Sequence, residues 1–160
     1  MSAKSSHKDM AGINLHVTKD DSVDTVQLVD DGVTPAKASF AKPSGILFTI
    51  DGGAAVITTG SKGYVTVPFK GTIKSCQVLA DQSGDIEVDV KKCDYSGFPT
   101  TATIVASAPP TLSSAQKSND ATLTGWTKDV VKGDILEFVV DSVATVEWVS
   151  IFLEIEKTAL

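Results

Sequence analysis

Aromatic residues, cysteine and long apolar runs are scarce in this sequence, and each shortage excludes something. Phe, Trp and Tyr make up 6% of the 160 residues, so a folded core has to be built mainly from Val, Ile, Leu and Ala. Two cysteines are too few for the disulfide framework of a small secreted domain. We therefore expect Cys76 and Cys93 to be reduced, buried thiols rather than a disulfide.

Membranes and nucleic acids are excluded as partners by what the sequence lacks. No apolar run is long enough to cross a membrane, and the N-terminus has no apolar region of the kind that marks a secretory signal. Basic residues are not in excess either, since 14 Lys and Arg stand against 20 Asp and Glu. Without a basic patch the chain has little to offer to phosphates. The sequence predicts a soluble protein made in the cytoplasm, which leaves the cell only as part of a particle.

Groups that could carry out catalysis are equally sparse. The two histidines, His7 and His16, lie near the N-terminus in a polar stretch where a rigid scaffold is not expected. The sequence has no Gly-x-Ser-x-Gly turn and no glycine-rich phosphate loop followed by Lys-Ser or Lys-Thr. No nearby cysteine or paired carboxylate completes a metal-ligand set around the histidines. We therefore expect that the protein is not an enzyme and binds no cofactor or metal.

The carboxylates between Asp81 and Asp89 come nearest to a calcium-binding loop. Glu87 and Asp89, however, alternate with Ile86 and Val88, which is typical of a strand with one solvated face. We interpret these carboxylates as surface residues rather than as metal ligands.

From Ile46 onward, apolar and polar residues alternate with the period of a β-strand. In the run 85–91, Ile86, Val88 and Val90 point to one side and charged residues to the other, as in a half-buried antiparallel strand. In the run 64–69, Pro68 cannot donate to a ladder, so this strand should end there or lie at a sheet edge. Further strands are predicted at 46–50, 54–58, 71–80, 103–106, 121–126, 136–140 and 143–156.

Turn residues separate the predicted strands, and no strand-helix-strand spacing is present. We predict breaks at Ser83-Gly84 and at Asp141-Ser142, and at most one turn of helix in 112–117. Many short strands of this kind indicate an all-β fold, an antiparallel β-sandwich or jelly roll. Residues 46–160 would form it as a single domain, preceded by an extended N-terminal arm, residues 1–45.

The few aromatic residues of the predicted domain allow two interpretations. A platform that stacks on a sugar could be formed by Trp126 and Trp148 with Tyr64, Tyr95 and Phe98, but in a chain so poor in aromatics we expect these side chains to fill the core or a subunit contact. Tyr95 and Phe98 fall in the turn-rich stretch 95–99. We predict that this stretch is an exposed contact loop, because loops on a rigid scaffold commonly carry binding residues.

The arm is polar and interrupted, so it should become ordered only by lying on something else. Its residues 7–16 fit a short docking turn. Residues 25–29 are a lone strand-like run that needs a partner edge in the domain, in another subunit or in a larger shell. About forty extended residues span on the order of 130 Å, far beyond the body of one domain. The predicted partner-docking residues are Met10, Ile13, Leu15, Val26, Leu28 and Val29.

Two stretches resemble virion proteins of tailed bacteriophages. Residues 7–16, His-Lys-Asp-Met-Ala-Gly-Ile-Asn-Leu-His, look like an N-terminal element of the form H-x-D-L-T-G-x-x-L-H found in phage head-decoration and fibre proteins. Residues 26–32, Val-Gln-Leu-Val-Asp-Asp-Gly, occupy the place of the strand that follows this element. Residues 63–90, together with 110–117, 123–126 and 133–134, are similar to a β domain that recurs in phage tail-fibre and virion structural proteins.

The resemblance implies a non-enzymatic role on the virion and supplies no catalytic residues. Our preferred hypothesis is a capsid decoration protein (a cement or head-fibre protein) on the capsid surface. Its arm would dock on the major capsid protein or another virion protein, and its β domain would project outward as part of a homotrimer. The alternative is a tail-fibre or receptor-binding protein that recognises a host glycan. A carbohydrate-active enzyme is a third, less favoured hypothesis.

Overall fold

The computed structural model describes residues 43–158, and every regular element in this range is a β-strand. The strands are β1 (Pro43–Asp51), β2 (Gly60–Thr66), β3 (Gly71–Cys93), β4 (Ala102–Thr103), β5 (Thr111–Asp120), β6 (Asp129–Val130), β7 (Ile135–Ala144) and β8 (Trp148–Lys157). No helix long and apolar enough to cross a membrane is found in this range. The predicted all-β class is confirmed for the part of the chain that the structure describes.

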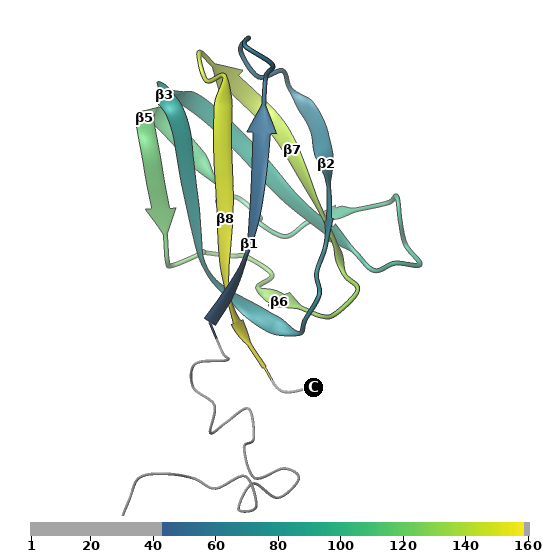
Figure 1. Ribbon diagram of the computed structural model, residues 1–160. Coiled ribbons are helices and arrows are strands. Elements are labelled where there is room, and N and C mark those ends of the chain that lie inside the picture. The colour runs from purple at the N-terminus through teal and green to yellow at the C-terminus, as the bar shows by residue number, and fades with distance from the viewer. Residues whose placement is uncertain (1–42, 159–160) are drawn as a thin grey trace, which may run out of the picture. The chain divides into compact units, whose positions relative to one another are not determined.

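One long strand organises the sheet. β3 pairs antiparallel with β8 along Gly71–Ala80 and then with β7 along Asp85–Cys93. β1 adds to β8 and β2 adds to β7, so the strand order is β1-β8-β3-β7-β2 (Figure 1). β5 runs along β3 as well, and β4 and β6 make short pairings with it. The chain therefore forms one antiparallel sheet around a 23-residue strand.

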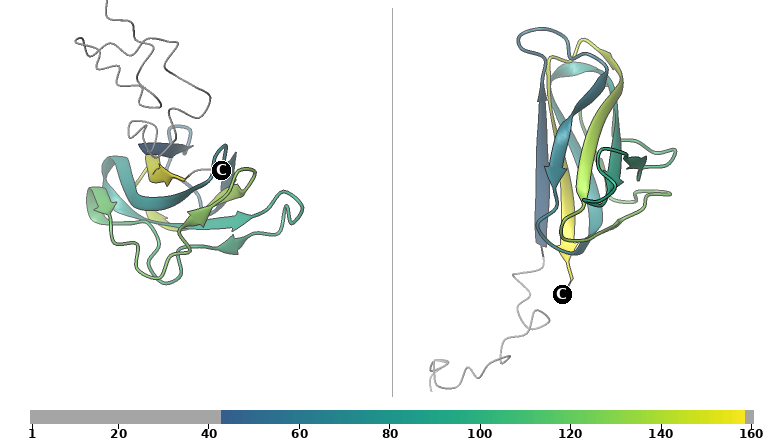
Figure 2. Two further views of the ribbon diagram at one scale, coloured as in Figure 1. Left: turned by 90° about the horizontal axis from the view of Figure 1, so that it is seen from below. Right: turned by 90° about the vertical axis from the view of Figure 1, so that its right-hand side faces the viewer.

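The sheet curls because β3 exchanges one partner for the other at residues 80–85. A Cβ on Gly84 would lie 2.5 Å from Oγ1 of Thr145 and 2.7 Å from the carbonyl oxygen of Ala144, so only glycine fits this approach to the β7–β8 connection. Figure 2 shows β1 and β8 along one side of the curl and β2 and β7 along the other. We call these the β1–β8 side, which includes Gly71–Ala80, and the β2–β7 side, which includes Asp85–Cys93.

The apolar core lies inside the curl. Every second residue of β8 is fully buried, namely Val149, Ile151, Leu153 and Ile155. The two sides meet where Phe48 of β1 stacks on Phe138 of β7, with ring centroids 4.3 Å apart and 4° between the ring planes. Each such buried aliphatic or aromatic side chain contributes roughly 1.5–3 kcal/mol of transfer free energy.

Several predicted strands are confirmed, and so are the faces that they bury. Ile86, Val88 and Val90 are at most 1% exposed, whereas Asp85 is exposed and Glu87 is half-buried. β2 ends at Thr66, before Pro68, and it lies at an edge of the sheet. Both outcomes follow from the alternation and from the missing N–H of proline.

Other local predictions are wrong. Residues 112–117 belong to β5 rather than to a helical turn, while 54–58 and 121–126 are loops rather than strands. The predicted break at Ser83-Gly84 lies inside β3, and Asp141-Ser142 lies inside β7, which turns only after Ala144. In 103–106, only Thr103 is in a strand.

These errors have one physical cause, which is long-range pairing. Ser83-Gly84 and Asp141-Ser142 stay extended because strands distant in the sequence, β5 and β3 respectively, pair beside them. Conversely, Ile57 is buried although it lies outside any strand. Its backbone N–H is satisfied there by the carbonyl of Val146 at 2.9 Å. Local propensity is overridden where tertiary partners satisfy the backbone.

β1 starts at Pro43, three residues before the boundary predicted at Ile46. The predicted arm lies, apart from its last residues, outside the described residues. So do the six docking residues Met10, Ile13, Leu15, Val26, Leu28 and Val29.

Candidate binding surface

The turn that follows β3 is built by its own polar side chains. The carboxylate of Asp94 accepts hydrogen bonds from the N–H of Gly97 at 2.6 Å and from the hydroxyl of Ser96 at 2.8 Å. These hydrogen bonds from Ser96 and Gly97 lower the pKa of Asp94. The N–H of Thr100 then donates to the carbonyl of Gly97 at 2.9 Å. The predicted contact loop is therefore a structured turn.

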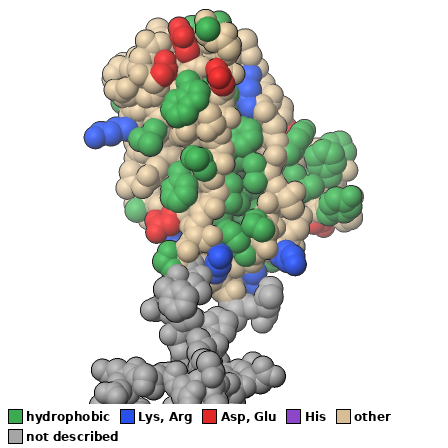
Figure 3. Space-filling model, viewed as in Figure 1, with side chains coloured by type: hydrophobic (Ala, Val, Ile, Leu, Met, Phe, Trp, Pro, Cys, Tyr) green, Lys and Arg blue, Asp and Glu red, His purple; other side chains and the backbone are tan. Residues whose placement is uncertain are grey.

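Three aromatic side chains surround this turn, and we call them the aromatic surface: Tyr64, Tyr95 and Phe98. Tyr95 is 84% exposed, the largest exposure among the large apolar side chains of the described residues. Phe98 packs edge-on against Tyr64, with ring centroids 5.0 Å apart and 79° between the planes. Figure 3 shows apolar side chains projecting at this place, beside β2. Tyr95 and Phe98 are exposed as predicted, while their role as contact residues stays a prediction.

Glu137 of β7 fixes the base of the aromatic surface. It is 8% exposed, and its carboxylate accepts hydrogen bonds from the hydroxyls of Ser61 at 2.6 Å and of Thr101. Burial acts to raise the pKa of Glu137. Hydrogen bonds from Ser61, Thr101 and Tyr64 and the positive charge of Lys91 outweigh it, so the pKa is lower than usual. The carboxylate joins β2, β7 and the end of the aromatic turn.

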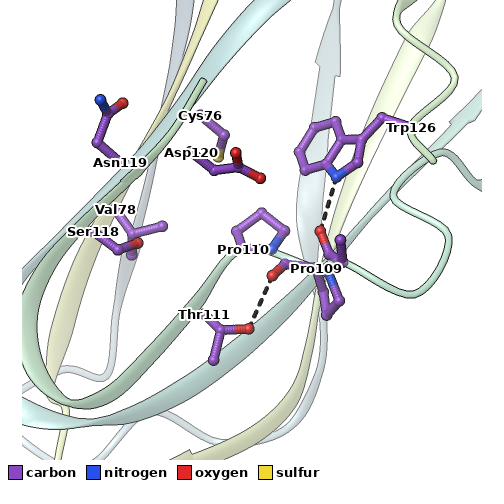
Figure 4. Close-up of a pocket in the computed structure, with 10 residues that line it drawn as sticks. Cys76, Val78, Pro109, Pro110, Thr111, Ser118, Asn119, Asp120 and Trp126 are labelled. Atoms are coloured by element: carbon purple, nitrogen blue, oxygen red, sulfur yellow. Dashed lines mark hydrogen bonds between the residues drawn. The ribbon is translucent and has the colours of Figure 1, made fainter. Parts of the chain in front are cut away.

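A pocket of about 200 Å³ lies elsewhere, between β3, β5 and the Pro109-Pro110 segment (Figure 4). The indole N–H of Trp126 donates to the carbonyl of Ala108 at 2.8 Å, which fixes one wall. Cys76 lies in another wall, and burial, followed by the charge of Asp120, raises its pKa to about 12. A thiol that stays protonated is a poor nucleophile. This pocket is smaller than most ligand sites, and its wall groups are engaged in the fold.

The carboxylates between Asp81 and Asp89 are spread over separate structural contacts. Asp81 accepts the N–H of Trp148 at 3.1 Å, and Asp85 accepts the N–H of Ser114 at 2.6 Å. Asp89 accepts the hydroxyl of Thr103 at 2.6 Å. Within residues 43–158, no group of three or more His, Cys, Asp or Glu residues is placed to hold a metal ion.

The remaining residues singled out from the sequence lie apart from one another. Both cysteines are free thiols, but only Cys76 is buried, and Cys93 is half-buried. The prediction that both thiols are buried is therefore wrong for Cys93, which ends β3 next to the aromatic turn. Trp126 fills the core as predicted, at 7% exposed, whereas Trp148 is 39% exposed. The aromatic residues do not form one continuous platform.

Comparison with known proteins yields little. No protein-family model matches the chain, and no curated protein sequence matches it. One solved structure that aligns with it is the crystal structure of serine protease of Aeromonas sobria, with 9% identity and a TM-score of 0.30. The alignment covers 71% of this chain and 27% of the protease chain.

Proposed function

We propose that this protein is a non-enzymatic structural protein of a tailed-bacteriophage virion, a capsid decoration (cement or head-fibre) protein. Its N-terminal arm docks on the major capsid protein or another virion protein through Met10, Ile13, Leu15, Val26, Leu28 and Val29. The β domain projects outward from the capsid surface as part of a homotrimer. The sequence resemblance given above supports the choice of virion and capsid.

The observation that carries the proposal is the pairing of the first and last strands of the domain. Pro43 lies opposite Glu156, so the chain enters the sheet at the same end at which its last strand finishes. The bend of β3 at residues 81–84 and the β7–β8 connection at residues 145–147 lie at the opposite end of the sheet. When the arm is bound, that opposite end is free to point away from the partner. A domain whose chain enters at one end of the sheet is suited to being anchored at that end.

The finer description of the fold belongs to the same proposal. The β1–β8 side and the β2–β7 side are taken as the two layers of an antiparallel sandwich, and the Phe48–Phe138 stack supports this. Jelly-roll-like sandwiches are frequent in viral shells.

The test is removal of residues 1–42 from the chain. We expect a folded β domain with a cooperative thermal transition that no longer co-sediments with phage particles. A matched control keeps the length of the arm and replaces Ile13 and Leu15 by serine, which should weaken sedimentation with particles and leave the melting temperature unchanged. Undiminished particle binding by the truncated domain would contradict the proposal.

The second candidate function is a tail-fibre or receptor-binding protein that recognises a host glycan, and the aromatic surface favours it. An 84% exposed Tyr95 next to an anchored Phe98–Tyr64 pair is a plausible stacking surface for sugar rings. Binding of the domain to host polysaccharide should then fall at least tenfold in Tyr95→Ala and Phe98→Ala. Trp148→Ala, which removes an exposed aromatic ring elsewhere, is the matched control.

A further inference from the structure

The two edge strands of the curled sheet are protected to different degrees. β1 and β2 each pair with one neighbour among the described strands, so each has a free edge. β1 pairs with β8 over nine residues without a register shift, and no charged residue lies between its end residues Pro43 and Asp51. An edge that is long, regular and uncharged is the type that accepts another strand.

β2 carries protection within the strand that β1 lacks, because the proline of β1, Pro43, is its first residue and leaves Ser44 to Ile50 open. Its pairing with β7 shifts register between Ser61 and Gly63, which is a bulge or an equivalent irregularity. Lys62 places a positive charge at that point, and Pro68 follows soon after the strand. Bulges, lysine and proline are the usual devices that prevent strand addition. Of these two edges, β1 is the open one.

The direction of the β1 backbone groups follows from the register. The N–H of Gly52 donates to the carbonyl of Glu147 at 2.8 Å, in continuation of the β1–β8 pairing. Because hydrogen-bonded pairs alternate along an antiparallel ladder, even-numbered residues of β1 bond to β8. Gly45, Leu47 and Thr49 therefore direct their N–H and C=O groups toward the free edge.

The surroundings of this edge are apolar on both faces. Leu47, on the outer face, is 61% exposed, and Phe48, on the inner face, is half-buried against the core. Figure 3 shows an apolar strip exposed between β1 and β2. A strand added beside β1 would cover these side chains as well as the backbone groups.

We propose that residues 25–29 of a neighbouring copy of this chain add to β1 as an extra strand. In Thr25-Val-Gln-Leu-Val29, Val26 and Leu28 share one face, which would continue the inward face of Ile46, Phe48 and Ile50. Thr25 and Gln27 would then lie on the outer face beside Leu47. Main-chain bonds provide the affinity in such strand addition, and the alternating side chains set the register.

The choice of a neighbouring copy rests on the proposed function, in which the domain is part of a homotrimer. The virion protein that Val26, Leu28 and Val29 contact is then another copy of this chain, and Met10, Ile13 and Leu15 are left for the capsid. Residues 30–42, which connect the run to β1, span roughly 45 Å when extended. A nine-residue strand is only about 30 Å long, so the run can leave its own domain and reach the next one. Strand donation in one rotational direction closes a ring of copies and leaves no β1 edge unpaired.

The first test measures the mass of the purified full chain by size-exclusion chromatography with light scattering. We expect an oligomer, and a monomer after removal of residues 1–42. Thr49→Pro removes an N–H that faces the free edge and should also give a monomer, as should Leu47→Lys, which places a charge where β2 has Lys62. Thr66→Pro is the matched control. The N–H of Val67 donates to the backbone carbonyl of Asp134 at 2.8 Å, so the N–H of the preceding residue, Thr66, faces the free edge of β2. This variant should remain an oligomer.

The second test locates the contact with cysteine pairs in a Cys93→Ser background, where the remaining thiol is buried. One chain carries Gln27→Cys and a second, differently tagged chain carries Leu47→Cys. Oxidation of the mixture should link the two tags, whereas Gln27→Cys mixed with Tyr64→Cys on β2 should not. A monomeric full chain, or a disulfide that forms only within one chain, overturns the inference. Neither test uses phage particles. A negative result would therefore contradict strand exchange between copies and leave the proposed docking on particles to its own test.

Discussion

The two sides of the curled sheet have similar inner faces and different outer faces. On the β1–β8 side, one row across the outer face reads Leu47, Phe152 and Gln77, and the next reads Thr49, Ser150 and Leu79. These two rows hold no charge, and Leu79 is 48% exposed. The charges of this face lie nearer the start of β1, at Lys74, Glu154 and Glu156. In Figure 3, apolar side chains are visible over β8 and β1.

On the β2–β7 side the corresponding rows are charged. Asp89 lies opposite Val139, and Lys91 lies opposite Glu137. Thr103 and Lys91 contact Asp89, and Ser61 contacts Glu137. Rows of paired charges resist association, whereas uncharged apolar rows next to an open edge favour it. The difference indicates which side of the domain meets other molecules.

The largest effect should come from the inner face that both sides share. Phe138→Ala removes the ring that stacks on Phe48 and leaves a cavity where the two sides meet. We expect a loss of about 3–5 kcal/mol in the free energy of unfolding, measured by urea denaturation. Val139→Ala, on the half-buried neighbouring position, is the control and should cost far less. Equal losses of unfolding free energy in the two variants would show that the Phe48–Phe138 contact does not stabilise the packing of the two sides.

A smaller effect should follow from the carboxylate that supports the charged side. Glu137→Ala leaves the hydroxyls of Ser61 and Thr101 without their acceptor, at a cost of about 1–3 kcal/mol. Because folding lowers the pKa of Glu137, its contribution is complete above the ordinary pKa of 4.5 and is lost as the pH falls through the folded-state value.

The matching measurement is the thermal midpoint between pH 7 and pH 3 for the natural chain and for Glu137→Gln. The variant should lack part of the acid-induced decrease. If both chains lose stability in parallel, Glu137 does not couple the charged side to pH.

The outer faces should respond to charge in opposite ways. Leu79→Lys, in an uncharged row of the β1–β8 side, and Glu87→Lys, on the β2–β7 side, should each change the free energy of unfolding by no more than about 0.5 kcal/mol. Self-association of the full chain, measured by light scattering against concentration, should decrease in Leu79→Lys and not in Glu87→Lys. If self-association decreased in Glu87→Lys and not in Leu79→Lys, the contact surface would not lie on the β1–β8 side.

The smallest effect is a difference in thiol reactivity between the two ends of β3, which can be measured without changing the stability of the protein. Burial raises the pKa of Cys76 to about 12, so this thiol should not react with a disulfide reagent until the domain unfolds. At the other end of the strand, desolvation and the charge of Asp94 raise the pKa of Cys93 as well, but this thiol is only half-buried, so it should react in the native protein. One thiol titrated in buffer and two in denaturant is the expected count, and two in buffer would mean that the β1–β8 side opens.

The sequence was informative wherever a pattern is local. Alternation identified Ile86, Val88 and Val90 as a buried face, and Pro68 marked the end of β2. The turn-rich stretch around Tyr95 and Phe98 was correctly predicted to be exposed. The open edge of β1 and the anchoring of the aromatic turn by Glu137 could not be found in this way. Both depend on which strands become neighbours across many residues.

By itself, the sequence determined that the described residues, 43–158, form strands and which side chains several of those strands bury. Its alternation is a property of a few consecutive residues, and hydrophobic burial acts directly on that pattern. Tertiary structure alone decided that Ser83-Gly84 continues β3, that residues 112–117 are a strand, and that β1 is left open while β2 is protected. Those outcomes depend on pairing between segments that are more than a hundred residues apart in the case of β1 and β8, for which a single stretch of sequence carries no local signal.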